Sequence, residues 1–72
     1  MVNIKMLRAK MLEKNISVEG LATIIGINKA TLYRRLNNGA EDMSIKEAVN
    51  IANALTLNAQ EVTNIFFASF VA

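Results

Sequence analysis

Basic, amide and aromatic side chains are concentrated in one short stretch of the chain, from Asn28 to Asn37. This stretch reads NKATLYRRLN and offers hydrogen-bond donors that suit phosphate oxygens and the edges of bases. Lysine and arginine can donate to guanine, the amide of asparagine can pair with adenine, and a side chain as small as alanine leaves room for the methyl group of thymine. The side chains of this stretch are chemically suited to contacts with a nucleic acid.

The residue types on which most enzymes and metal sites depend are missing from the sequence. It contains no histidine and no cysteine, so a metal ion would have only carboxylates to bind it, and no disulfide can form. It also contains no glycine-rich phosphate loop and no pair of carboxylates placed for acid–base chemistry. We therefore expect no enzyme activity, no metal, no cofactor and no small-molecule substrate.

The net charge of +2 is unevenly distributed along the chain. Residues 1–35 carry seven basic and two acidic side chains, a net charge of +5, whereas residues 36–72 carry one basic and four acidic side chains, a net charge of −3. A basic half favours a polyanionic partner, because each neutralised phosphate releases counterions on binding. Alternatively, these charges form a solvated surface that binds no partner, and their uneven distribution is accidental.

At 72 residues the chain has room for one small domain. No apolar run approaches the roughly 20 residues that span a bilayer. The first residues alternate basic with apolar side chains and lack the apolar segment and cleavage site of a signal peptide. We expect a cytoplasmic protein with no membrane partner.

Apolar residues recur at helical spacing along the whole chain and nowhere alternate as they do in a strand. Ser17, Asn28, Ser44 and Asn58 are candidate N-caps, and Gly26 can adopt the left-handed backbone that ends a helix. These signals predict helices over residues 3–14, 18–25, 29–37, 45–55 and 59–70. The predicted fold class is all-α, a compact five-helix domain.

The spacing of the apolar residues also predicts which side of each helix faces the core. The inward residues expected for the first, fourth and fifth helices are Ile4, Leu7, Met11 and Leu12; Ile45, Ala48, Val49 and Ala52; and Val62, Ile65, Phe66 and Phe70. Phe67 and Val71 point to another side of the last helix, which makes them a candidate partner interface. Alternatively, Phe67 covers the end of the first helix.

Five residues between positions 22 and 36 fit the joint between two steeply crossed helices. Ala22 is small enough for a second helix to cross over it, Gly26 permits the tight turn, and Ile27 can enter the core just after the turn. Leu32 and Leu36, four residues apart, would anchor the second helix and leave its other side free. This combination predicts a helix-turn-helix, in which the second helix reads the major groove of DNA.

The stretch from Leu21 to Arg34, LA-(three residues)-GINKATLYR, closely resembles the helix-turn-helix of the Cro and phage-repressor family. Helices before and after it, in so short a chain, resemble the five-helix members encoded by temperate phages. The resemblance covers residues 3 to about 66. It implies a sequence-specific transcription regulator of the lysis–lysogeny switch type, which binds a double-stranded DNA operator in the cytoplasm of a bacterial host.

The family pattern implies which residues face the DNA. It places six of them on the exposed side of the third helix and one at the start of the second helix, where a phosphate is held: Asn28, Lys29, Ala30, Tyr33, Arg34, Asn37 and Ser17. Arg34 is the candidate for a bidentate contact to guanine, and Lys14 and Arg35 would contact phosphates. Arg35 departs from the pattern, because many members have an apolar residue there.

Other roles remain open for several of these residues. Ser17 and Asn28 are also explained as helix caps, Tyr33 as a shield for the edge of the core, and the two arginines as a solvated surface.

A protein partner is the alternative to DNA as the ligand. Small helix-turn-helix proteins of phage switches sometimes act by binding a repressor, and a helix that presents Tyr33 and Arg34 can dock into a protein groove as well. The interface at Phe67 and Val71 would serve a homodimer if the protein binds two half-sites of DNA, as Cro-like proteins do, and a co-encoded phage repressor in the alternative.

Overall fold

The computed structural model describes residues 2–68, and this range contains five helices and no strand. The helices are α1 (Ile4–Glu13), α2 (Val18–Ile25), α3 (Lys29–Asn37), α4 (Ile45–Ala54) and α5 (Ala59–Phe66). The predicted all-α, five-helix fold is confirmed. The last helix ends earlier than expected, at Phe66, and the predicted positions Phe70 and Val71 lie outside the described residues.

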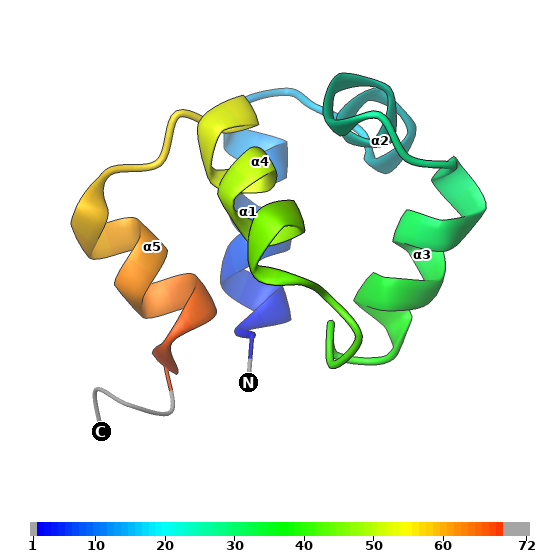
Figure 1. The fold of residues 1–72 in the computed structure, drawn as a ribbon. Helices are drawn as coiled ribbons and strands as arrows, with labels where there is room; N and C mark the ends of the chain where they lie inside the picture. Colours follow the sequence, from blue (N-terminus) through cyan, green and yellow to red (C-terminus); the bar gives the residue numbers. More distant parts are fainter. Residues whose placement is uncertain (1, 69–72) are drawn as a thin grey trace.

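The helices are arranged around α4 and α1, which lie one in front of the other in the middle of the molecule (Figure 1). On one side of this pair lies α5, and on the other lie α2 and α3. The helix α2 packs against both α3 and α4, whereas α1 packs against α5. The N-terminal segment is held to α5 by the backbone amide of Asn3, which donates to the Ile65 carbonyl at 2.7 Å.

Every helix begins at a side chain that caps it. Asn3, Ser17, Asn28, Ser44 and Asn58 each accept a hydrogen bond from a backbone amide in the first turn. The starts of α4 and α5 are full capping boxes, in which Glu47 and Glu61 also accept from the amide of the cap residue. A side-chain cap contributes about 1 kcal/mol, so the local sequence largely determines where each helix starts.

Four helix ends share one geometry, in which a residue with positive φ follows the helix. These residues are Asn15, Gly26, Gly39 and Thr56, with φ values of 58°, 77°, 72° and 53°. In each case the next amide donates to the carbonyl five residues earlier, as in Ile27 to Ala22 at 3.0 Å. This closure turns the chain sharply enough for five short helices to pack together.

The core is formed by all five helices. Its largest fully buried side chains are Leu7, Leu21, Leu32, Ile51, Leu55 and Ile65. Ala22 is 1% exposed, and Ile27 packs against the same cluster. Both observations agree with the roles predicted for these residues at the joint between α2 and α3.

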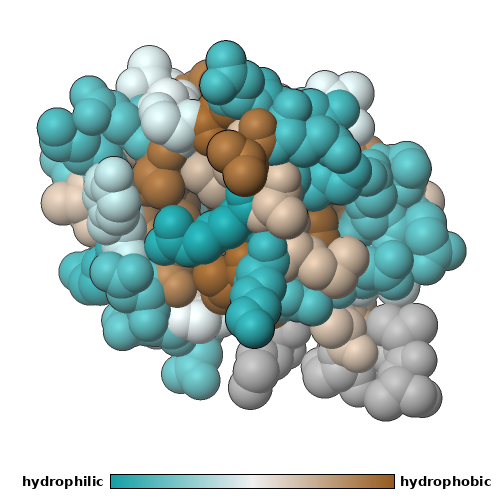
Figure 2. All heavy atoms as spheres, turned by 180° about the vertical axis from the view of Figure 1, so that it is seen from behind, coloured by the Kyte–Doolittle hydropathy of each residue, from teal (hydrophilic) through white to brown (hydrophobic). Residues whose placement is uncertain are grey.

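Three residues expected in the core are on the surface instead. Leu12 is 83% exposed, Ile45 82% and Val49 51%, so their predicted inward positions were wrong. A small domain gives each helix few neighbours, and only part of its apolar side is covered. In α1 the buried line consists of Leu7 and Met11. Figure 2 shows the face opposite to that of Figure 1, where hydrophobic residues lie exposed among hydrophilic ones.

Candidate nucleic-acid interface

The joint between α2 and α3 has the geometry of a helix-turn-helix. Gly26 ends α2 in the left-handed conformation, with φ of 77°, and Asn28 caps α3 two residues later. A side chain at position 26 would meet no steric obstacle, so it is the backbone conformation that calls for glycine. Ala22 is buried, and α2 and α3 pack directly against each other.

The helix α3 has one buried and one exposed side. Leu32 is fully buried and Leu36 is 3% exposed, so the two leucines anchor the helix as predicted. The structure places all six residues predicted for DNA contact on the exposed side, namely Asn28, Lys29, Ala30, Tyr33, Arg34 and Asn37. The Tyr33 side chain is 47% exposed, so it does not form part of the buried core.

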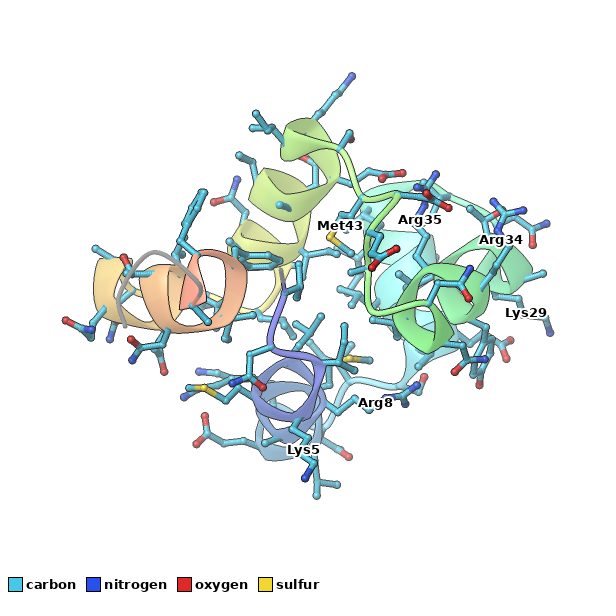
Figure 3. The ribbon with its side chains drawn as sticks, turned by 90° about the horizontal axis from the view of Figure 1, so that it is seen from below. Lys5, Arg8, Lys29, Arg34, Arg35 and Met43 are labelled. Atoms are coloured by element: carbon cyan, nitrogen blue, oxygen red, sulfur yellow. The ribbon has the colours of Figure 1, made fainter. Side chains whose placement is uncertain are left out.

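The long basic side chains of α3 point in different directions. In the view from below, Lys29 and Arg34 project outward from the edge of the molecule, whereas Arg35 turns toward Met43 (Figure 3). On α1, Arg8 reaches toward the side of the molecule that holds α3, and Lys5 points away from the body. The cations that can meet a polyanion at α3 are therefore Lys29 and Arg34.

Ser17 and Asn28 both act as caps. The Ser17 hydroxyl accepts from the Gly20 amide at 3.0 Å, and the side-chain carbonyl of Asn28 accepts from the Ala30 amide at 2.7 Å. Because the Asn28 oxygen is engaged, its amide nitrogen is the atom that can donate to a phosphate or a base. Ser17 stands at the start of α2, where backbone amides can also hold a phosphate.

The charges near the start of α3 are weakly paired. Lys29 Nζ lies 3.6 Å from Glu19 Oε2, and both side chains are more than half exposed. An ion pair as exposed as this one contributes little to stability and is screened by salt. Lys29 is therefore free to exchange the carboxylate for a phosphate.

Arg35 has a different environment from the one expected. Its Nη2 lies 3.2 Å from Glu47 Oε2, and its Nη1 donates to the Asp42 carbonyl at 2.5 Å. The Arg35 and Glu47 side chains are only 18% and 17% exposed. Arg35 is thus mostly buried and engaged within the protein, unlike Lys29 and Arg34, which project outward. The sequence contained one signal for this buried position of Arg35: many members of the family that it resembles have an apolar residue there.

Lys10 is also engaged, in ion pairs with Glu13 and Glu61 at the surface. The hydrogen bond that Lys10 donates to Glu61 raises the pKa of Lys10, with a smaller contribution from the bond to Glu13. The same bond lowers the pKa of Glu61, helped by the Asn58 amide. This cluster connects α1 to the start of α5 and holds the ammonium of Lys10 between two carboxylates.

A second surface feature is an apolar groove between the N-terminal segment, α4 and α5. It encloses about 360 Å³ and is lined mainly by apolar side chains, including Ile45, Val49, Phe66 and Phe67. Phe67 is 49% exposed there, which agrees with its predicted surface position. Sequence reasoning assigned Ile45 and Val49 to the core and so missed their part in this groove.

Within residues 2–68 no helix is both long enough and apolar enough to cross a membrane.

The comparison with known families matches residues 6–65 to the Cro/C1-type HTH DNA-binding domain. The match covers most of the chain, so the protein belongs to this family of DNA-binding regulators. It confirms the resemblance that the stretch from Leu21 to Arg34 suggested. Neither the curated proteins nor the solved structures gave a match.

Proposed function

We propose that the protein is a sequence-specific transcriptional regulator of the Cro type, which inserts α3 into the major groove of an operator. The single observation that carries this proposal is the two-sided character of α3. Leu32 and Leu36 fix one side in the core, while Lys29, Tyr33 and Arg34 stand exposed on the other. Its place is a temperate phage or prophage, in the cytoplasm of the bacterial host, as the family resemblance implies.

Each exposed residue of α3 suits one kind of contact. Arg34 can bind guanine O6 and N7 with two hydrogen bonds, Lys29 can reach a guanine or a phosphate, and Ala30 leaves space for a thymine methyl. Tyr33, Asn28 and Asn37 have the donors for sugar–phosphate or base contacts. Ser17 and the amides at the start of α2 would hold a phosphate and so fix the position of the domain on the duplex.

The proposal is tested by selecting binding sites from random double-stranded DNA with the purified protein. We expect one preferred sequence, and affinity that falls steeply with salt. Arg34→Ala should weaken binding to that sequence by about 10- to 100-fold and relax the preference at one base pair. The matched control is Lys5→Ala, which removes the same charge from a side chain that points away from the body in Figure 3. An equal loss in both variants would contradict base reading by Arg34.

We also propose a homodimer that forms through the apolar face around the α4–α5 groove. The exposed Ile45, Val49 and Phe67 support it, because all three line the same groove. Val71, which was predicted to share the interface, lies outside the described residues. Two copies joined in this way would place two α3 helices on the two half-sites of an operator.

The oligomeric state tests the dimer. Sedimentation equilibrium should give a dimer for the unmodified chain and a monomer for Phe67→Ser with unchanged helix content. Leu12→Ser, on the exposed side of α1, is the control and should remain a dimer.

The second candidate is an antirepressor that binds a phage repressor through this face or through α3. It is favoured if the chain stays monomeric, shows no binding to any duplex, and binds a co-encoded repressor with an affinity that Phe67→Ser or Tyr33→Ala removes.

A further inference from the structure

Glu47 uses its two carboxylate oxygens for two different parts of the fold. Its Oε1 accepts from the Ser44 amide at 3.0 Å and so completes the capping box of α4. Its Oε2 lies 3.2 Å from Nη2 of Arg35, near the end of α3. The start of α4 is therefore attached to the helix that carries the exposed basic residues.

Arg35 makes this attachment directional. One guanidinium nitrogen binds Glu47, and another donates to the carbonyl of Asp42 in the segment between α3 and α4. Its Nε is buried without a hydrogen-bond partner. A buried donor without a partner is unfavourable, so the side chain is kept here by its two outer contacts.

These contacts add a restraint to those of the core. Leu32 and Leu36 are four residues apart and lie along one side of α3, so a contact on another side of the helix restrains its rotation about its own axis, its roll, more strongly than they do. Arg35 lies about 100° around the helix from Leu36. A contact at that angle restrains the roll, and with it the directions of Lys29 and Arg34.

We propose that Arg35 and Glu47 are positioning residues that set the roll of α3 on the operator and thereby its sequence preference, without touching DNA. The inference rests on the proposed DNA-binding function. Well-packed apolar residues often replace mostly buried ion pairs without loss of stability. What the planar guanidinium of Arg35 adds, through contacts to Glu47 and to the Asp42 carbonyl in different directions, is a defined orientation.

The molecule contains a matched control for this proposal. At the start of α5, Glu61 accepts from the Asn58 amide through Oε1 and binds Lys10 of α1 through Oε2. The arrangement is the same, but it connects α1 with α5 and does not involve α3.

The experiment compares Arg35→Met and Glu47→Gln with Lys10→Met and Glu61→Gln. Glutamine keeps an oxygen for the cap but loses the charge. The first readout is the ratio of dissociation constants for the selected operator and for operators with one base pair changed. We expect this ratio to fall by about tenfold in both variants of the Arg35 pair, and to be unchanged in both variants of the Lys10 pair. The double variant Arg35→Met/Glu47→Gln should lose no more than either single variant, because both remove one interaction.

The salt dependence of binding separates positioning from direct contact. A positioning role predicts an unchanged slope of log affinity against log salt concentration in Arg35→Met. A slope reduced by about one in Arg35→Met but not in Glu47→Gln would instead mean that Arg35 binds a phosphate. That result would overturn the proposal, as would an operator ratio equal to that of the unmodified protein.

A second readout needs no DNA. Amide chemical shifts of Tyr33 and Arg34 should change in Arg35→Met and in Glu47→Gln and stay constant in the two control variants. If the unmodified protein binds no duplex, the proposed function fails, and this measurement still decides whether the pair orients α3. Unchanged shifts would refute the orienting role.

Discussion

At the start of α4, Glu47 accepts from the Ser44 amide with one oxygen and meets Arg35 with the other; at the start of α5, Glu61 does the same with Asn58 and Lys10. The two regions have the same local signal, a cap residue followed by glutamate three positions later. They differ in the cation and in the helix that supplies it. Lys10 extends from α1, and Arg35 from α3.

This difference shows how the same combination of a capping box and an ion pair can have two roles. The single ammonium of Lys10 is shared between Glu13 and Glu61, which fixes a distance but little orientation. The planar guanidinium of Arg35 binds Glu47 and the Asp42 carbonyl in different directions. We therefore expect the pair at α5 to affect stability alone and the pair at α4 to affect recognition as well.

The largest effect on stability is expected at Ala22, where neither ion pair can make up for a loss of packing. Ala22→Val adds two methyl groups to a residue that is 1% exposed, next to the packing of α2 on α3. Overpacking there should lower the free energy of unfolding by about 1–3 kcal/mol, measured by urea denaturation. Ala30→Val is the control at an exposed position. If Ala22→Val lowers the free energy of unfolding no more than Ala30→Val does, the contact between α2 and α3 has room for a larger side chain. The Arg35–Glu47 pair would then contribute more to the orientation of α3.

An intermediate effect tests whether the two caps are equivalent. Ser44→Ala and Asn58→Ala each remove the side-chain acceptor for the amide of the glutamate. Each should cost about 1 kcal/mol in thermal or urea unfolding, because the two boxes have the same hydrogen bonds. Operator preference should change only in Ser44→Ala, where the position of Glu47 is loosened. A change of operator preference in Asn58→Ala would contradict the view that only the pair at the start of α4 affects recognition.

The smallest effect concerns acid pH and the pair at α5. The hydrogen bond to Lys10 lowers the pKa of Glu61 below its ordinary 4.5. The stabilisation is therefore complete above that value and is lost as pH falls through the lowered pKa. Lys10 has a raised pKa, so its contribution is lost only as pH rises through that raised value.

The measurement is the free energy of unfolding from neutral pH down to about pH 2, in the unmodified protein and in Glu61→Gln. The difference between the two should shrink as the solution becomes acidic. A constant difference would mean that the Lys10 pair contributes no pH-dependent stability.

Local signals in the sequence were enough to predict most of the fold. Cap residues and the glycine at position 26 act within a few residues of themselves, so the starts of α2 to α5 and the turn after α2 followed from composition and spacing. Leu32 and Leu36 were likewise assigned correctly, because four-residue spacing places them on one side of α3.

Features that depend on distant parts of the chain were not predicted. Leu12, Ile45 and Val49 continue apolar stripes, but only the packing of the other helices determines how much of each stripe is covered. The same holds for the partner of Arg35, since nothing near position 35 indicates an acceptor twelve residues later. The residues of α3 that were predicted to face DNA are all exposed; that they face DNA and contact bases remains a prediction.

The shared use of Glu47 also has an evolutionary consequence. An apolar residue at position 35 would leave the carboxylate of Glu47 mostly buried without its cation, and a neutral residue at position 47 would leave the mostly buried guanidinium of Arg35 without its carboxylate. Each single step is unfavourable, whereas the two together are close to neutral. We therefore expect positions 35 and 47 to be exchanged as a pair among descendants of this sequence. Such a paired exchange would change the preferred operator sequence at once, although every residue predicted to face the bases stays the same.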